Sequence, residues 1–305
     1  MQTAGEVVVK IIVTYDKDVH KRAKREINLF EVFHENRYIC NFINGFSADE
    51  KSGAPAICAS ILTFYKLGTV ESLIKDGKRE YTKQANGISC LLLKHTIDMA
   101  KDVLSGLQCM HQMKFVHRDI KPGNICVKLL PMKDENRLQY IIIDLGAAVA
   151  IKKHKTSGPG ASDEPGDDSS DESASFTGQF TSMAGQKLPL GTVPFMSPEH
   201  IDPSLSVDGR ADIFGLGVTM FVCLCGRFPF VQPSICRDMK LLGVKMLQRY
   251  AMPREASTLK IYNTEVQSFS DEEVIAVVVK SLRKERKQRY RTAIDMKKHL
   301  EQIDR

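Results

Sequence analysis

The sequence predicts an α+β fold with two lobes, a small β-rich one followed by a larger, mainly helical one. Up to about residue 64, apolar β-branched runs and one polar segment of helical spacing follow each other as strand, helix, strand, strand. From about residue 91 onward, the long patterned segments have helical spacing instead. The chain has 305 residues, which is enough for one large domain of this kind.

The small lobe is expected to cover about residues 1–62. Residues 7–13 (VVVKIIV) form an apolar, β-branched run, which predicts a buried strand. Residues 17–34 are rich in Lys, Arg and Glu, and Ala23, Ile27 and Phe30 recur at spacings of four and three, which predicts a helix. Two further strands are predicted at 39–46 and 57–64, with a turn between them.

The large lobe is expected over residues 66–305, after a connection at 63–65. Residues 91–113 have helical spacing, and a hairpin (ICVKLL and YIIID) follows. Helical patterns return from residue 211 onward. The segment 152–188 differs, because it is rich in Ser, Gly, Asp and Glu and nearly free of aliphatic residues. It cannot bury enough apolar surface to offset its ordering entropy, so we predict that it is disordered.

Composition excludes several classes of protein. No apolar run reaches the roughly 18 residues of a membrane span, and the N-terminus lacks a signal-peptide pattern. The eight cysteines contain no C-x-x-C pair, which favours free thiols in a reducing compartment. We therefore expect an intracellular protein, cytoplasmic or nuclear. The formal net charge of +6 permits a polyanionic partner without requiring one.

The segment HRDIKPGN, residues 117–124, is the most specific motif in the chain. Six specified positions at a background of about 5% each give roughly one chance match in 10^8 positions. The segment resembles the catalytic loop of protein kinases, and the lysine followed by proline resembles their serine/threonine branch. The resemblance extends from about residue 7 to about residue 300, and implies a protein kinase-like fold.

This resemblance implies a role for each polar residue of the loop. Asp119 would accept the proton of a substrate hydroxyl, Lys121 would reach the γ-phosphate of ATP, and Asn124 would bind Mg²⁺. The later segment IIIDLGAA resembles the D-F-G motif, with Leu145 in the Phe position, and its Asp144 would also hold Mg²⁺. ATP and Mg²⁺ are therefore the expected cofactors, and serine or threonine hydroxyls of proteins the expected substrates.

Three downstream segments extend the resemblance. GTVPFMSPEH resembles the end of a kinase activation segment, in which Thr192 would bond to the catalytic loop. Glu199 would form a buried ion pair with Arg289, because KERKQRYRTA resembles the family's D-P-x-x-R stretch. RADIFGLGV resembles the helix whose aspartate, here Asp212, braces the catalytic-loop backbone.

Upstream, VVVKI resembles V-A-I-K, so that Lys10 would contact the α- and β-phosphates and Glu26 would be its helix partner. An ordinary strand-edge lysine and a solvated glutamate are the alternative interpretation of these two. ILTFYKLGTVESLI resembles the hinge between kinase lobes, with Leu62 as gatekeeper. The further predicted ATP-binding residues are Val8, Leu62, Thr63, Phe64, Tyr65 and Cys126, with Val8 lining the adenine and the backbone of residues 63–65 holding it.

The family places a glycine-rich loop two strands before the V-A-I-K lysine. Only nine residues precede Lys10, so the loop and its strands do not fit there. The strand at 7–13 would then have an unpaired edge, which is an aggregation liability. We therefore interpret the sequence as a truncated version of a longer protein, and a domain that lacks the loop is the alternative.

Two other function classes are weighed. A pseudokinase scaffold is favoured by the missing loop and opposed by the residues at positions 10, 26, 119, 124 and 144. A small-molecule kinase is opposed by GTVPFMSPEH, which resembles a peptide-docking segment. The basic run at 283–291 is expected on a solvated rim of the large lobe. We expect a monomer that binds protein substrates and neither nucleic acid nor membrane.

Regulation is predicted from Arg118, which precedes the catalytic aspartate. In kinases with this Arg-Asp pair, the arginine often lies beside a phosphorylated residue of the activation loop. The acidic run around residues 163–172 would repel a phosphate on its own serines. Thr181 and Ser182 lie clear of that run, so we predict that phosphorylation of one of them activates the enzyme.

Overall fold

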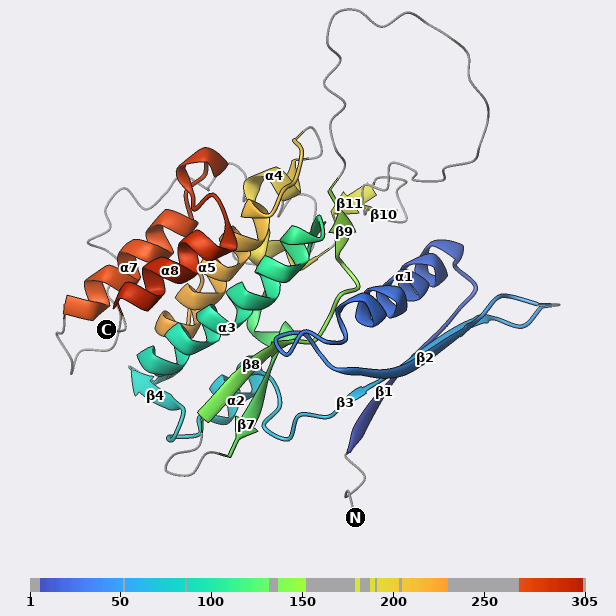
Figure 1. The fold of residues 1–305 in the computed structure, drawn as a ribbon, viewed down its shortest axis with the longest axis horizontal. Helices are drawn as coiled ribbons and strands as arrows, with labels where there is room; N and C mark the ends of the chain where they lie inside the picture. Colours follow the sequence, from blue (N-terminus) through green and yellow to red (C-terminus); the bar gives the residue numbers. More distant parts are fainter. Residues whose placement is uncertain are drawn as a thin grey trace, which may run out of the picture.

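The computed structural model describes residues 6–51, 53–85, 87–131, 137–151, 179–181, 187–189, 191–202, 205–229 and 269–303. These residues form a sheet with one long helix, followed by a larger helical body (Figure 1). The predicted α+β architecture with two lobes is therefore confirmed. None of the helices in these ranges is both long and apolar enough to cross a membrane.

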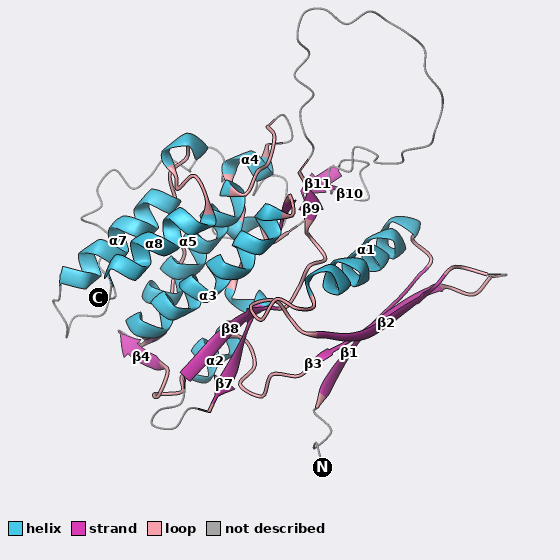
Figure 2. Cartoon of the chain, in the orientation of Figure 1, coloured by secondary structure: helices cyan, strands magenta, loops and turns pink. Residues whose placement is uncertain are grey.

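The small lobe is an antiparallel sheet in the order β1–β3–β2, with α1 across one face (Figures 1 and 2). Its elements are β1 (Val7–Thr14), α1 (Lys17–Phe33), β2 (Phe42–Ala48) and β3 (Ala56–Thr63). β2 begins three residues later than predicted. The preceding residues instead join the lobes, since the amide of Cys40 donates to the carbonyl of Ile142 at 2.7 Å.

Helix α1 begins because Asp16 caps it. The Asp16 carboxylate accepts hydrogen bonds from the amides of Asp18 and Val19, which satisfies two N–H groups that a helix start leaves free. The buried residues of α1 then recur every three or four positions: His20, Ala23, Glu26, Ile27, Leu29, Phe30 and Phe33. This stripe faces the sheet and the large lobe, so it also carries Glu26 into the interior.

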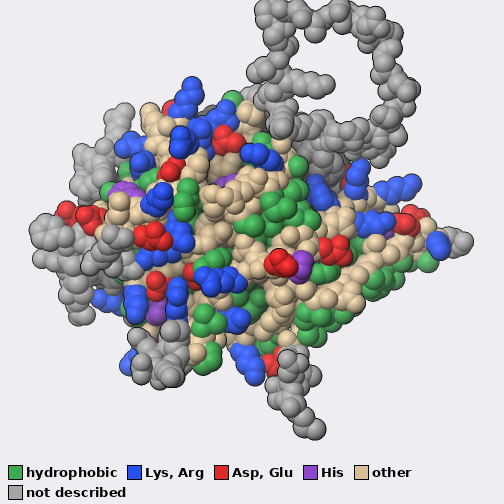
Figure 3. All heavy atoms as spheres, in the orientation of Figure 1, with side chains coloured by type: hydrophobic (Ala, Val, Ile, Leu, Met, Phe, Trp, Pro, Cys, Tyr) green, Lys and Arg blue, Asp and Glu red, His purple; other side chains and the backbone are tan. Residues whose placement is uncertain are grey.

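Strand β1 is more exposed than the sequence predicts. Its outward residues are between 48% and 62% exposed: Val7, Val9, Ile11 and Val13. Within the described residues β1 pairs with β3 alone, and α1 covers only the opposite face of the sheet. Figure 3 shows hydrophobic side chains along this part of the surface. The expectation of a buried strand is therefore wrong, because periodicity cannot tell how many neighbours a strand has.

The large lobe contains the remaining elements. They are α2 (Val70–Asp76), β4 (Thr82–Ala85), β5 (Ile88–Leu91), α3 (Leu93–Gln112), β6 (Phe115–Val116), η1 (Pro122–Asn124), β7 (Ile125–Leu130), β8 (Arg137–Ile142), β9 (Val149–Ala150), β10 (Gln179–Thr181), β11 (Lys187–Pro189), η2 (Val193–Phe195), α4 (Pro198–Ile201), α5 (Arg210–Cys225), α7 (Phe269–Ser281), η4 (Arg286–Gln288) and α8 (Ala293–Ile303).

Helices α3 and α5 form the centre of this lobe. The inward side chains of α3 are fully buried, among them Met99, Leu104, Leu107 and Met110. Helix α5 is apolar on every side and buried along almost its whole length, as expected of a helix enclosed by others. It contacts α3 and α7, and α8 packs on α3 (Figure 1). This core supports the hairpin β7–β8 and the catalytic loop before it.

The acidic segment 152–188 lies mostly outside the described residues. The exceptions are the strands β10 and β11, which pair antiparallel with Phe180 opposite Leu188. The acidic run ends before these positions. The disorder of the segment 152–188 stays a prediction.

We expect the α3 core to dominate the stability of the large lobe. Leu107→Ala removes a fully buried side chain and should lower the free energy of unfolding by about 2–5 kcal/mol. Chemical denaturation of the whole chain measures this value. Met113→Ala is the control, because Met113 directly follows α3 and is 47% exposed. Equal losses for the two variants would contradict the assignment of the core.

Candidate active site

The catalytic loop follows β6 and is held by Asp212 at the start of α5. The amides of His117 and Arg118 donate to the Asp212 carboxylate at 2.9 and 2.8 Å. Arg118 has a φ of 68°, in the left-handed region that a residue with a side chain rarely adopts. His111 of α3 places its Nε2 2.8 Å from the same carboxylate. Asp212 is buried, which by itself opposes ionisation, but these donors lower its pKa below the ordinary value.

Asp119 is positioned by three donors. The amide of Thr192 donates to its Oδ1 at 2.8 Å, while Lys121 Nζ and Asn124 Nδ2 donate to its Oδ2 at 2.9 and 2.8 Å. Burial opposes the charge of Asp119, but the ammonium of Lys121 outweighs it and the pKa lies below the ordinary value. A carboxylate has about four acceptor positions, so one remains for a further hydroxyl.

Thr192 links the catalytic loop to the segment before α4. Its hydroxyl accepts a hydrogen bond from Lys121 Nζ at 2.5 Å, in addition to its amide bond to Asp119. The residue before it, Gly191, has a φ of 128°, and a Cβ there would come within 3.0 Å of the carbonyl oxygen of Arg118. Only glycine fits this approach without strain, so Gly191 allows Thr192 to reach the loop.

Asn124 and Asp144 offer oxygen atoms of the kind that Mg²⁺ prefers. The Nδ2 of Asn124 donates to the carbonyl and to Oδ2 of Asp119, which leaves its Oδ1 as an acceptor. Asp144 accepts the amide of Gly146 at Oδ1, and its side chain is 41% exposed. These two residues therefore fit a magnesium ion, with a carboxylate and an amide oxygen accessible beside Asp119.

Lys10 joins the two lobes electrostatically. Its Nζ donates to both carboxylate oxygens of Glu26 at 2.8 Å, and lies 3.9 Å from Oδ1 of Asp144. Burial disfavours the ammonium, but the carboxylates of Glu26 and Asp144 more than compensate and raise the pKa of Lys10. Burial raises the pKa of Glu26, with Asp144 acting in the same direction. Lys10 is therefore a cation that faces Asp144, and the surface-lysine interpretation does not describe it.

The hinge residues lie where β3 ends. Leu62 and Tyr65 are buried, and Val8 of β1 is the pairing partner of Leu62. The amide of Phe64 donates to the carbonyl of Glu6 at 3.1 Å, so this N–H is already used. The amide of Thr63 likewise donates to the carbonyl of Asn41 at 3.1 Å.

Cys126 is buried in β7, two residues after Asn124. Burial raises the pKa of its thiol to about 11, so it behaves as a small apolar group there. Its role as an ATP-binding residue stays a prediction.

Glu199 and Arg289 form a buried, two-pronged ion pair. Arg289 Nη1 donates to Oε1 of Glu199 at 2.6 Å, and Nη2 donates to Oε2 at 2.8 Å. The guanidinium also donates to three carbonyls, those of Arg283, Lys284 and Arg210. Its donors are thereby all directed at acceptors, which is what makes a buried charge tolerable. The pair ties α4 to the segment before α8.

Arg118 has an incompletely satisfied guanidinium. Its Nε donates to the carbonyl of Ala147 at 2.8 Å, but its buried Nη2 has no hydrogen-bond partner among the residues described. Burial, and then the nearby charge of Arg25 on α1, lower the pKa of Arg118 to about 10. The buried Nη2 of Arg118 is therefore a donor without an acceptor in the described part of the chain. Thr181 lies in β10, while Ser182 lies outside the described residues.

Most of the predicted site residues lie around Asp119. The sequence analysis did not single out several residues that support the catalytic loop. His111 contacts Asp212, which holds the loop, while Arg25 lowers the pKa of Arg118 and Gly191 lies close to the Arg118 carbonyl. Gly191 belongs to the segment GTVPFMSPEH, so its signal was present. Nothing in the local sequence connects His111 with Asp212, which is 101 positions away.

The comparisons with known proteins agree with this geometry. A family model described as "Protein kinase domain" matches residues 1–300. The chain belongs to the protein kinase family. The match includes the catalytic loop, the D-x-G segment and the end of the activation segment. The fold is that of a kinase domain.

Curated relatives include several kinases. The serine/threonine-protein kinase PrkC of Bacillus subtilis is 25% identical over 300 residues, covering 96% of this chain and 38% of PrkC. The DNA damage response protein kinase DUN1 of Saccharomyces cerevisiae is 28% identical, with 75% of this chain and 39% of DUN1 covered. The 3-phosphoinositide-dependent protein kinase 1 of Caenorhabditis elegans is 34% identical over 43% of this chain and 21% of its own length. The kinase thus spans at most about two-fifths of these relatives.

The buried ion pair should contribute to stability as well as to the shape of the site. Glu199→Ala leaves the Arg289 charge buried without its partner and should lower the free energy of unfolding by about 3–5 kcal/mol. A double-mutant cycle with Arg289→Ala should show strong coupling by denaturation. Arg291→Ala is the control, because Arg291 is 82% exposed and its pair with Asp295 lies at the surface. A cycle without coupling would contradict the proposed contribution.

Proposed function

We propose that this kinase transfers the γ-phosphoryl group of ATP to serine or threonine hydroxyls of proteins, with Mg²⁺. The observation that carries the proposal is the arrangement of Asp119, with one acceptor position left, beside Lys121, Asn124 and Asp144. Each supplies what phosphoryl transfer needs, which is mainly positioning and charge neutralisation. The similarity to PrkC, a serine/threonine-protein kinase, favours serine and threonine as acceptors.

Each of these residues would have a separate role in phosphoryl transfer. The free acceptor position of Asp119 would take the hydrogen of the substrate hydroxyl and orient its oxygen toward the phosphoryl group. Lys121, held between Asp119 and Thr192, would neutralise charge on that group as it moves. Lys10, fixed by Glu26, would bind the α- and β-phosphates. Mg²⁺, held by Asn124 and Asp144, would neutralise phosphate oxygens.

The depressed pKa of Asp119 favours a role as hydroxyl-orienting group over that of a strong base. Its three donors stabilise the carboxylate, so it is ionised at neutral pH and accepts a hydrogen bond readily. The hydroxyl proton would pass to the Asp119 carboxylate only as the new phosphate ester forms. This agrees with a loose transition state, in which the nucleophile needs little activation.

Asp119→Asn should abolish phosphoryl transfer while ATP binding persists. The amide cannot take the hydroxyl proton, so we expect a loss of about 10²–10⁴-fold in kcat on a serine/threonine peptide library. A thermal-shift titration with Mg-ATP should give similar affinities for both proteins. Asp76→Asn is the matched control, because Asp76 is exposed at the end of α2. A wild-type chain that binds ATP but transfers no phosphate would indicate a pseudokinase instead.

We further propose that a phosphate on Thr181 or Ser182 activates the enzyme through Arg118. The support is the buried Nη2 of Arg118, which lacks an acceptor among the described residues, and the nearby charge of Arg25. A phosphate oxygen would satisfy that donor and balance the charge, which would order the segment that carries it.

The Thr181→Ala/Ser182→Ala double variant should lose most of the activity of the phosphorylated protein. Phosphopeptide mapping of active protein should find one of the two sites occupied. Ser173→Ala is the control, because Ser173 adjoins the acidic run, where a phosphate would meet like charge. Undiminished activity of the double variant would rule out this mechanism.

A further inference from the structure

The turn between α7 and α8 is strongly basic. Its Lys and Arg residues are Lys280, Arg283, Lys284, Arg286, Lys287, Arg289 and Arg291, and its acidic residue is Glu285. We call residues 280–291 the basic turn. Figure 3 shows Lys and Arg side chains gathered over this part of the surface, and Figure 1 shows the turn, in red, beside α4. The contact of Arg289 with Glu199 of α4 fixes the turn in that place.

Three of these cations lack an ion-pair partner within the described part of the chain. The cations that already have a partner are Lys280, Arg286, Arg289 and Arg291. Arg283, Lys284 and Lys287 are exposed, and their side chains make neither an ion pair nor a hydrogen bond among the residues that the structure describes. Like charges so close together attract an anion from solution.

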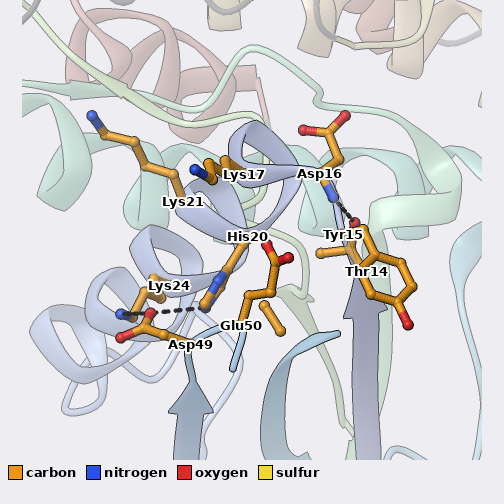
Figure 4. A pocket seen from close by; sticks show the side chains of 10 residues that line it. Thr14, Tyr15, Asp16, Lys17, His20, Lys21, Lys24, Asp49 and Glu50 are labelled. Carbon is orange, nitrogen blue, oxygen red and sulfur yellow. Dashed lines mark hydrogen bonds and ion pairs between the residues drawn. The ribbon is translucent and has the colours of Figure 1, made fainter. Parts of the chain in front are cut away.

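The cavity between the end of β1 and the start of α1 is a useful contrast (Figure 4). Its lining lysines are Lys17, Lys21 and Lys24, and its lining acids are Asp16, Asp49 and Glu50. Figure 4 shows Lys24 bound to Asp49, at 2.7 Å. The charges of that cavity are therefore compensated by its own side chains, whereas those of the basic turn are not.

The backbone below the exposed cations is rigidly held. Arg289 Nε donates to the carbonyl of Arg283 at 2.7 Å, and its Nη2 donates to the carbonyl of Lys284 at 3.0 Å. Lys287 lies in the short helix η4. Because Arg289 is itself held by Glu199, the turn has one fixed shape. A surface that is ordered before binding loses less entropy when a partner arrives.

The chemistry of the turn favours the carboxylates of a peptide over a nucleic acid. Tyr290, the aromatic residue of the turn, is 4% exposed, and Lys280 Nζ lies 4.3 Å from the centroid of its ring. The ring therefore offers no face on which a base could stack. Exposed Glu285 follows Lys284 directly and would repel the closely spaced phosphates of a nucleic acid. An acidic peptide has fewer charges and can place them away from Glu285.

We propose that the basic turn docks an acidic segment of the protein substrates. Arg283, Lys284 and Lys287 pair with carboxylates of that segment, at a distance from the hydroxyl that is phosphorylated. The place of the turn supports this role, because α4 beside it follows closely after Thr192, which contacts Asp119. The identity of the partner as a substrate rests on the proposed function, whereas the binding itself requires no phosphoryl transfer.

Fluorescence anisotropy tests the binding with the whole chain and a labelled peptide in which Glu and Gly alternate. We expect saturable binding that weakens as salt is added, and none of a matched peptide with Gln in place of Glu. The measurement needs no catalysis, so its result stands apart from that of any activity assay. Absence of saturable binding would overturn the proposal, as would tighter binding of a single-stranded oligonucleotide of the same charge.

Variants locate the surface. Arg283→Gln/Lys284→Gln/Lys287→Gln should weaken peptide binding by about tenfold, as expected for the loss of three exposed ion pairs. The control Lys78→Gln/Arg79→Gln/Lys128→Gln removes the same charge from exposed positions elsewhere and should change the affinity by less than about twofold. Glu285→Gln should strengthen binding, because it removes the opposing charge. Equal weakening by the control, or weaker binding by Glu285→Gln, would contradict the assignment of the surface.

Kinetics connect the surface to substrates. The substrate is a serine/threonine peptide that a flexible linker joins to the acidic peptide. For it, the triple variant at positions 283, 284 and 287 should raise KM by about tenfold and leave kcat unchanged. For the same peptide without the acidic part, both constants should stay as in the wild type.

Two results would overturn the assignment to substrates. One is an unchanged KM for the joined peptide in a triple variant that no longer binds the acidic peptide. The other is binding of the acidic peptide only by the variant Asp167→Asn/Asp168→Asn/Asp171→Asn/Glu172→Gln, because the chain's own acidic run would then be the occupant. Absence of transfer to either peptide would contradict the proposed function, and with it the identification of the partner as a substrate.

Discussion

The carboxylate of Asp212 is the group on which the catalytic loop depends. It accepts two consecutive amides, those of His117 and Arg118, and so compensates a left-handed conformation at Arg118 that costs about 1–2 kcal/mol for a residue with a side chain. His111 supports it from α3. Because Asp119 follows Arg118 directly, the direction of its carboxylate is set by this bond pattern. The buried aspartate is therefore a structural requirement of the chemistry, although it lies outside the reach of a substrate.

The two lobes meet through charge as well as through apolar packing. Lys10 belongs to the small sheet, Glu26 to the helix that crosses it, and Asp144 to the large lobe. Glu26 is almost fully buried, so its pKa is raised, and the ammonium of Lys10 is what makes its charge tolerable. Any shift of α1 would change this balance directly. The position of α1 is therefore coupled to the charge balance at Lys10.

The sequence predicted the site better than its surroundings. HRDIKPGN and GTVPFMSPEH could be interpreted because their residues are contiguous and their types follow from phosphoryl transfer. The helices at 17–33 and 93–112 had strong periodicity, and the structure has both. In contrast, α2 and the hairpin β4–β5 were not predicted, since they are short and weakly patterned. The contact of His111 with Asp212 was also out of reach, because partners so distant in the chain leave no local signal.

The pair of Glu199 and Arg289 has a consequence for the order in which the protein is synthesised. Its partners are separated by 90 positions, and the guanidinium also donates to the carbonyls of Arg210 and Lys284, which lie between them in the chain. During translation, α3, α5 and the catalytic loop emerge well before Arg289 does. Until then the carboxylate of Glu199 has no counter-charge, so α4 cannot settle in its final place. The position of α4 is therefore fixed only after the segment that contains Arg289 has joined the fold.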